Sequence, residues 1–273
     1  MLKQVLWYVR KFLNLCFVSL QLFFYGIFHP RRTLYELLVP IVQVINEYHQ
    51  FTHSRLLNFF ETDMVKDISH ETIFAMSNVF NMDFNVTRHS ETQVLSALVR
   101  YLKPKRIFEI GTYHGFTTLH MAANSPEDCL VYTLDLPPGY DQSAQEEIKQ
   151  FAYSDLLVMK LSVASFSKRI YKNRPENAKI RELFGNSMKF DFSPYYGQMD
   201  IIFVDGNHTH PYIQSDTDNA LKMLSPQGII VWHDFDFIFH RAIFDYLNKL
   251  AKNYKIYSVP KTRFALFGPN RIR

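Results

Sequence analysis

Five short, mostly apolar runs, each followed by a glycine or a polar residue, constrain the fold of this chain more than any other feature. They cover residues 106–110, 130–134, 180–184, 200–204 and 228–232. Such runs are typical of buried strands, and segments with helical periodicity lie between several of them. Strands that alternate with helices indicate a parallel sheet covered on both faces. The sequence therefore predicts an α/β fold with a Rossmann-like, doubly wound sheet.

Two further strands are expected at the C-terminal end, over residues 255–259 and 263–267. Pro260, Lys261 and Thr262 join them in a tight turn, so the sheet is mostly parallel with an antiparallel C-terminal hairpin strand. The helices that we expect around the sheet cover residues 90–102, 212–224 and 237–252. The first of them carries Ser90 and Gln93 at the spacing of a capping box.

The chain divides into an N-terminal helical extension, residues 1–85, and an α/β domain, residues 86–273. The extension has helical patterns at 34–49, 54–60 and 71–80. Within the domain, an irregular insertion at 137–177 carries a helix near 143–153, and we expect it to act as a lid.

Residues 12–28 are almost entirely apolar and are flanked by basic residues. Three interpretations stay open for residues 1–28: a helix in a membrane interface, a helix packed on its own domain or on a partner copy in a homo-oligomer, and a membrane anchor.

Composition excludes several classes of protein. The chain of 273 residues is 47% hydrophobic and carries a net charge of +4. Its lysines and arginines are scattered, so we expect no nucleic acid partner. The two cysteines, Cys16 and Cys129, lack the spacing of a metal site or of a disulfide framework. A cytoplasmic protein, with membrane association through residues 1–28 left open, is the expectation.

A candidate cofactor loop follows the first strand, over residues 109–115. Gly111 permits a sharp strand-to-helix turn, and Gly115 lets the next helix approach the sheet. Asp135 follows Glu109 at about the spacing at which an acid meets ribose hydroxyls. Tyr113 is bulky at a position where a nicotinamide loop has glycine. The loop therefore favours a nucleoside cofactor without phosphates.

A second group of polar residues follows the fourth and fifth strands. It consists of Asp205, His208, His210, Asp216, His233 and Asp234. Because neighbouring parallel strands lie about 4.8 Å apart, Asp205 and Asp234 are expected to lie close together. Asp205, His208 and Asp234 are candidate ligands for a divalent cation, Mg²⁺ or Mn²⁺. Two alternatives stay open: a metal-free base at His208 or His233, and a purely structural role.

The segment 109–115 resembles the first motif of class I S-adenosylmethionine-dependent methyltransferases. The downstream segments 204–208, 216–217, 224–228 and 231–234 are similar to the bacterial methyltransferase 24 family. That family is related to cephalosporin-hydroxylase-type and catechol O-methyltransferase-like enzymes. The resemblance covers about residues 90–270, and the C-terminal antiparallel hairpin agrees with it.

The resemblance implies a role for each matching residue. The backbone of Gly111, with Thr112, Tyr113 and Gly115, would contact the amino-acid end of S-adenosylmethionine, and Glu109 would hold this loop. Asp135 would bind the ribose hydroxyls. Asn186 and Ser187 would lie near the adenine, and Asp205 beneath the reactive methyl group. Many relatives have an acid in place of Asn186, and the catechol-type enzymes have an asparagine where Phe235 stands.

The expected activity is direct in-line methyl transfer to a hydroxyl, or less readily an amine, of a small molecule, with metal assistance left open. His208, His233 and Asp205 are the candidate catalytic residues. Two alternatives are a metal-dependent hydrolase or hydroxylase that uses the His/Asp cluster, and a catalytically decayed, membrane-tethered binding protein.

Overall fold

The computed structural model describes residues 55–56, 89–140, 153–237, 239–259 and 262–270, all within the compact unit His49–Arg273. The apolar stretch 12–28 and the helices expected at 34–49 and 71–80 lie outside the described residues. Among the residues that are described, no helix combines the length and apolar character needed to cross a membrane.

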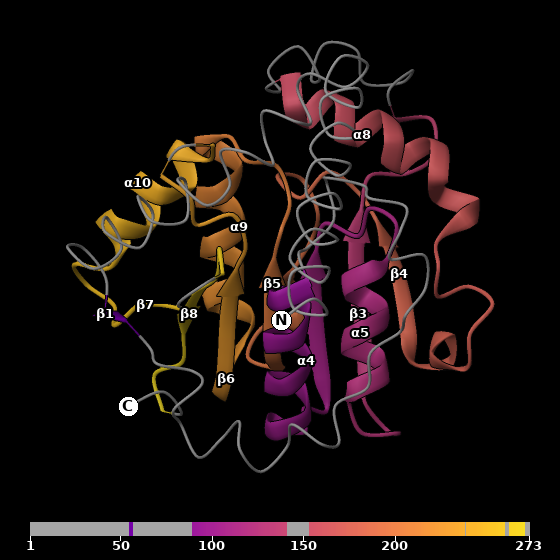
Figure 1. Ribbon diagram of the computed structural model, residues 1–273, viewed down its shortest axis with the longest axis horizontal. Coiled ribbons are helices and arrows are strands. Elements are labelled where there is room, and N and C mark those ends of the chain that lie inside the picture. The colour runs from indigo at the N-terminus through magenta and orange to yellow at the C-terminus, as the bar shows by residue number, and fades with distance from the viewer. Residues whose placement is uncertain (1–54, 57–88, 141–152, 238, 260–261, 271–273) are drawn as a thin grey trace, which may run out of the picture. The chain divides into compact units, whose positions relative to one another are not determined.

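An eight-stranded sheet with the order β1-β7-β8-β6-β5-β2-β3-β4 forms the centre of this unit (Figure 1). Its strands are β1 (Arg55–Leu56), β2 (Arg106–Ile110), β3 (Leu130–Asp135), β4 (Ile180–Phe184), β5 (Met199–Val204), β6 (Leu224–Trp232), β7 (Tyr257–Ser258) and β8 (Ala265–Phe267). Only the β6–β8 and β7–β8 pairs are antiparallel, and the other pairs are parallel. The predicted doubly wound sheet with one antiparallel hairpin strand is confirmed.

Side chains of the central strands alternate between two hydrophobic cores, as the period of a strand requires. In β5, Ile201 and Phe203 face one core, whereas Ile202 and Val204 face the other. Both faces are therefore apolar, which explains why the central strands read as continuous apolar runs rather than as alternating patterns.

Helices cover both faces of the sheet (Figure 1). The first core packs against α4 (His89–Leu102) and α5 (Phe116–Asn124). The second packs against α9 (His210–Met223) and α10 (Arg241–Leu250). Short 3₁₀ turns complete the connections at η1 (Phe166–Lys168), η2 (Pro175–Lys179) and η3 (Ser193–Tyr195).

The helix α8 (Tyr153–Ser165) belongs to the long insertion after β3. In Figure 1 it lies at the top of the view, beyond the carboxyl ends of the central strands. The sequence analysis expects a helix at residues 143–153 and irregular structure over most of α8. The expected helix lies almost wholly outside the described residues. The lid role of the insertion stays a prediction.

One predicted helix is wrong within the described residues. The pattern at 54–60 predicts a helix, but Arg55 and Leu56 form β1 and pair with Tyr257 and Ser258 of β7. The open edge of β7 offers backbone hydrogen-bond partners, and this tertiary pairing overrides a weak local pattern.

The close approach of β2 to the backbone after β5 gives a first testable prediction. Gly111 has a φ of +97°, and a Cβ there would lie 2.0 Å from the carbonyl oxygen of Asp205. Gly111→Ala is therefore expected to lower the free energy of unfolding by about 3 kcal/mol or more, measured by urea denaturation.

Gly197→Ala is the matched control. Gly197 also has a positive φ, +70°, but a Cβ there would meet nothing within 4 Å. Gly197→Ala should lower the free energy of unfolding only by the cost of backbone strain, about 1 to 2 kcal/mol. Equal losses in the two variants would show that the contact with Asp205 does not constrain the turn.

Candidate active site

The predicted cofactor loop turns sharply at the carboxyl end of β2. Gly111 and Tyr113 have positive φ values of +97° and +49°, and Gly115 has +77° at the start of α5. A Cβ on Gly115 would lie 2.2 Å from the ring of Tyr171. Both glycines are thus required by close packing, but the neighbour of Gly115 is Tyr171 of the insertion, whereas the sequence analysis expects the sheet there.

Glu109 holds this loop from beneath. Its Oε2 accepts hydrogen bonds from Thr118 of α5 and from Thr133 of β3, and the hydroxyl of Thr133 also pairs with that of Thr112. Burial raises the pKa of Glu109 to about 8, although these hydrogen bonds oppose the shift. The carboxyl is therefore protonated at neutral pH and joins β2, β3 and α5 without adding a negative charge.

Asp135, the predicted ribose acid, ends β3 beside this loop. It accepts hydrogen bonds from the backbone N–H groups of Tyr113 and Leu136, from the hydroxyl of Ser162, and from Arg169. Burial raises the pKa of Asp135, and the charge of Arg169 opposes the shift. Three of these donors share Oδ2, so Oδ1 is the oxygen with more room for another donor.

Arg169 fixes the end of the insertion against the loop. Its guanidinium, buried almost completely, pairs with Asp135 at 2.8 Å and with Glu182 of β4 at 2.9 Å. The hydroxyl of Tyr171 donates to the same Glu182, and the ring of Tyr171 packs on Gly115. The insertion therefore helps to build the cofactor side of the site.

Asn186 follows β4 and is buried. Its amide donates to the hydroxyls of Tyr140 and Tyr212, at 2.9 and 2.8 Å. Its Oδ1 accepts the N–H of Met188, which fixes the orientation of the amide. The polar group expected near adenine is thus held between two tyrosines that the sequence does not single out. Burial raises the pKa of Asp216 to about 7, and the nearby Ser187 opposes the shift.

On the other side of the loop, Asp205 ends β5 and His233 ends β6. Nδ1 of His233 lies 2.9 Å from Oδ1 of Asp205, and its Nε2 lies 3.1 Å from Oε2 of Glu91. Burial alone would lower the pKa of His233, but the surrounding carboxylates, Asp205 foremost, raise it to about 10. His233 is therefore a charged bridge between two acids at neutral pH.

His208 is held in a similar way. Its Nδ1 lies 2.6 Å from Asp155 of α8, and its Nε2 lies 3.0 Å from Oδ2 of Asp234. Burial would lower the pKa of His208, yet the hydrogen bonds with Asp155 and Asp234 raise it well above the usual range. Each ring nitrogen of the two candidate histidine bases therefore lies near a carboxylate oxygen, and both imidazoles are in the charged, doubly protonated form.

Asp234 lies between positive groups and has a φ of +56°. Arg263, from the turn between β7 and β8, donates to Oδ1 of Asp234 and to both carboxylate oxygens of Glu91. Burial would raise the pKa of Asp234, but Arg263 and the nearby imidazoles hold it well below its usual range. Aspartate tolerates this left-handed backbone better than most residues do.

The predicted metal ligands are divided between two groups. His208, Asp234 and His240 have ligand atoms within 4.8 Å of one another, and so do Asp205, His233 and Asp234. The predicted set, Asp205, His208 and Asp234, draws on both groups and stays a prediction.

The structure brings Asp205, His208, His233 and Asp234 together at the carboxyl edge of the sheet, whereas His210 is exposed on α9 and Asp216 lies outside this cluster. It adds three residues that sequence reasoning missed. These are Glu91, Asp155 and Arg263. Glu91 had one usable signal: it is an acid on the face of α4 that carries the apolar residues Val94, Leu95 and Leu98. Asp155 lies in the irregular insertion, and Arg263 begins the strand expected at 263–267, where nothing in the sequence marks it as a partner of Glu91.

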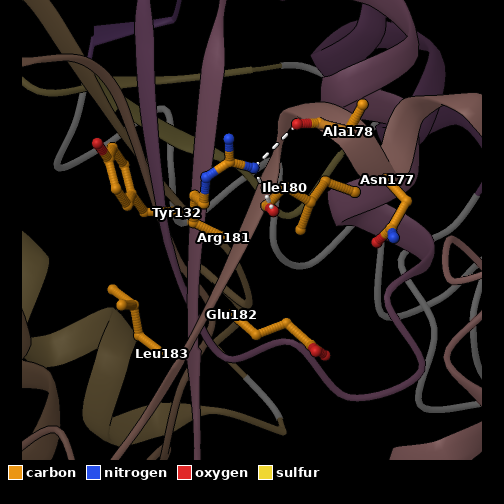
Figure 2. A pocket seen from close by; sticks show the side chains of 7 residues that line it. All are labelled: Tyr132, Asn177, Ala178, Ile180, Arg181, Glu182 and Leu183. Atoms are coloured by element: carbon orange, nitrogen blue, oxygen red, sulfur yellow. Dashed lines mark hydrogen bonds between the residues drawn. The ribbon is translucent and has the colours of Figure 1, made fainter.

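A separate pocket lies along the edge strand β4 (Figure 2). Its lining residues are Tyr132, Asn177, Ala178, Ile180, Arg181, Glu182 and Leu183. Arg181 donates there to the carbonyl oxygens of Ala178 and Ile180. None of the predicted cofactor or catalytic residues lines it, and we assign it no part in the activity.

The strand order, with one antiparallel strand inserted between β6 and β7, and the glycine loop at the end of β2 are those of the class I, Rossmann-like methyltransferase fold. Residues 108–235 match the family Methyltransf_24, which is described as a methyltransferase domain. This match covers slightly less than half of the chain and agrees with the resemblance that the sequence carries.

Individual relatives are distant. The chain is 25% identical over 162 residues to an uncharacterised protein of Sinorhizobium fredii, covering 56% of this chain and 16% of that protein. It is 21% identical over 167 residues to the probable caffeoyl-CoA O-methyltransferase 3 of Dictyostelium discoideum, covering 60% and 64%. The chain thus spans less than two thirds of the length of either relative.

Solved structures with a similar fold include the SAH-bound methyltransferase of Podospora anserina, with 17% identity and a TM-score of 0.47 over 81% of this chain and 92% of that chain. Another is the SAM-bound O-methyltransferase of Streptomyces achromogenes, with 16% identity and a TM-score of 0.46 over 83% and 96%.

The charged state of His233 predicts a pH dependence of stability. Between pH 6.5 and about 10, the folded chain keeps a proton on His233 that the unfolded chain has lost. The free energy of unfolding should therefore fall as the pH rises through this window, by at most about 1.4 kcal/mol per pH unit from this group.

His233→Gln should flatten that slope, measured by urea denaturation at several pH values. His210→Gln, which changes an exposed histidine at the start of α9, should leave the stability unchanged. An unaltered slope in His233→Gln would mean that His233 is not the group that holds the proton.

Proposed function

We propose that this chain transfers the methyl group of S-adenosylmethionine to an oxygen of a small molecule. One observation carries the proposal: Gly111 and Asp205 meet between β2 and β5, where the strand order reverses. In a doubly wound sheet, ligands bind in the crevice at this point. The name of the Dictyostelium relative supports an oxygen acceptor over an amine.

Three groups of residues would hold the cofactor. The backbone of Gly111 to Gly115 would contact its amino-acid end, with the neutral Glu109 fixing the loop. Asp135 would accept hydrogen bonds from the ribose hydroxyls at Oδ1. Asn186, placed by Tyr140 and Tyr212, would border the adenine. The cofactor itself supplies the electrophilic methyl group, and the chain supplies position and charge.

Asp205 is the residue best placed to accept the proton of the acceptor hydroxyl. His233 engages its Oδ1, and the side chain keeps 23% of its surface exposed. His233 and His208 would then serve as positive charges beside the forming oxyanion rather than as free bases, because both already carry a proton. Activation by a divalent cation at Asp205, His208 and Asp234 is the competing route.

The setting of the activity stays as the sequence predicts it: a small-molecule acceptor, a cytoplasmic location and peripheral membrane contact or homo-oligomer formation through residues 1–28. The two alternative functions are tested with the same measurements. A hydrolase or hydroxylase would not bind S-adenosylmethionine, and a decayed binding protein would bind it without turnover.

Binding of S-adenosylmethionine to the full chain, measured by isothermal titration calorimetry, tests the cofactor site. We expect Asp135→Asn to weaken binding about tenfold or more, because the ribose loses a charged acceptor. Asp245→Asn, on the exposed Arg241–Asp245 pair of α10, should leave binding unchanged. If the wild-type chain does not bind S-adenosylmethionine at millimolar concentration, the proposal is contradicted.

Methyl transfer itself is tested by the formation of S-adenosylhomocysteine over a panel of small phenols and alcohols. Asp205→Asn should lower kcat about 100-fold at saturating cofactor, because a positioned proton acceptor is lost. Cofactor affinity should change much less than kcat. If Asp205→Asn and the Asp245→Asn control turn over equally fast, Asp205 is not the proton acceptor.

A further inference from the structure

Four carboxylates converge at the acceptor side of the site from four different elements. They are Glu91 of α4, Asp155 of α8, Asp205 after β5 and Asp234 after β6, and three of them are at least nine-tenths buried. Buried carboxylates are stable only when positive groups pair with them. A divalent cation is one way to meet this need, and a fixed side-chain cation is another.

Arg263 supplies the fixed cation. Its Nε lies 3.1 Å from Oε1 of Glu91 and its Nη2 lies 3.3 Å from Oε2, while Nη1 donates to Oδ1 of Asp234. Only 11% of its side-chain surface is exposed. A guanidinium does not lose its proton in proteins, so this positive charge is permanent.

The backbone holds Arg263 in place as well. Its N–H donates to Oε1 of Glu91 at 2.8 Å, and its carbonyl oxygen accepts the N–H of Phe235 at 2.9 Å. The side chain of Phe235 is buried and stacks on Phe244 with ring centroids 5.0 Å apart. The residue after Asp234 therefore positions the arginine and offers no side-chain ligand for a metal.

Arg263 also opposes a metal ion at the two groups whose ligand atoms lie close enough together to hold one. Asp234 belongs to both candidate groups of metal ligands. One of its oxygens accepts from Arg263, and the other lies 3.0 Å from Nε2 of His208. A divalent cation bound at either group would sit beside the permanent positive charge of Arg263, which repels it.

We propose that Arg263 occupies the role of a divalent cation in this site, so that the domain holds its carboxylates without a metal. Arg263 is a positioning residue: it fixes Glu91, Glu91 fixes His233, and His233 fixes Asp205. The inference rests on the proposed function only for its consequence, which is methyl transfer that chelators do not inhibit.

Binding of Mn²⁺ to the full chain without S-adenosylmethionine, measured by electron paramagnetic resonance, tests the inference independently of turnover. The wild-type chain should bind no stoichiometric Mn²⁺ up to about 1 mM. Arg263→Gln should bind Mn²⁺ with a dissociation constant at least about tenfold below this wild-type limit, because the substitution leaves the carboxylates without their cation. Adding Asp234→Asn to that variant should abolish the gain.

Two controls make the result specific. Arg263→Lys keeps the positive charge and should not bind Mn²⁺. Arg241→Gln removes an exposed arginine of α10 and should bind no more Mn²⁺ than the wild-type chain does. A folded Arg263→Gln chain without a gain would overturn the inference.

If Arg263→Gln does not fold, as judged by circular dichroism, the wild-type chain and Asp234→Asn decide. Stoichiometric Mn²⁺ binding by the wild-type chain that Asp234→Asn removes would overturn the inference. If the wild-type chain binds no stoichiometric Mn²⁺ and its turnover is unchanged by EDTA, the inference is supported. Because the metal measurement needs no cofactor, it keeps its meaning even if methyl transfer is not found.

Discussion

The contact between the backbone of Gly111 and the carbonyl group of Asp205 is the constraint on which both halves of the site depend. Beside this contact, the backbone N–H of Asp205 donates to the carbonyl oxygen of Ile110 at 2.8 Å and joins the ends of β2 and β5 at the point where the strand order reverses. On one side lies the cofactor loop, fixed by Glu109, and on the other lies the network of Asp205 and His233. A side chain at residue 111 would separate these halves, so glycine is required there for geometry as much as for any ligand.

Most of the sheet could be predicted because its strands are buried on both faces. A strand such as β5 (Met199–Val204) is recognisable without partners, since a short apolar run has few other uses. The short strands β1 and β7 are different. Each has only two residues, and they exist because they pair with each other at the edge of the sheet. A local pattern does not contain that information, which is why the helix expected at 54–60 is wrong.

The site divides in the same way. Asp205, His233 and Asp234 were predictable, because polar residues directly after buried strands must meet at the carboxyl edge of a parallel sheet. Glu91 and Arg263 were not, since 172 residues separate them and their pairing needs the finished fold. The sequence therefore identified Asp205 and Asp234, but it missed Glu91, Asp155 and the arginine that pairs with Glu91 and Asp234. It left open a metal site, a metal-free histidine base and a structural role.

The helix α8 connects the cofactor side to the acceptor side, although no strand-end pattern marks it. Near its end, Ser162 donates to Asp135, and near its start, Asp155 pairs with His208. A single helix thus contributes to the residue expected at the ribose and to the residue expected near the acceptor. Any displacement of α8 by a bound ribose would also alter the surroundings of His208. Cofactor binding and acceptor activation would then be coupled through one element, because both depend on the position of the same helix.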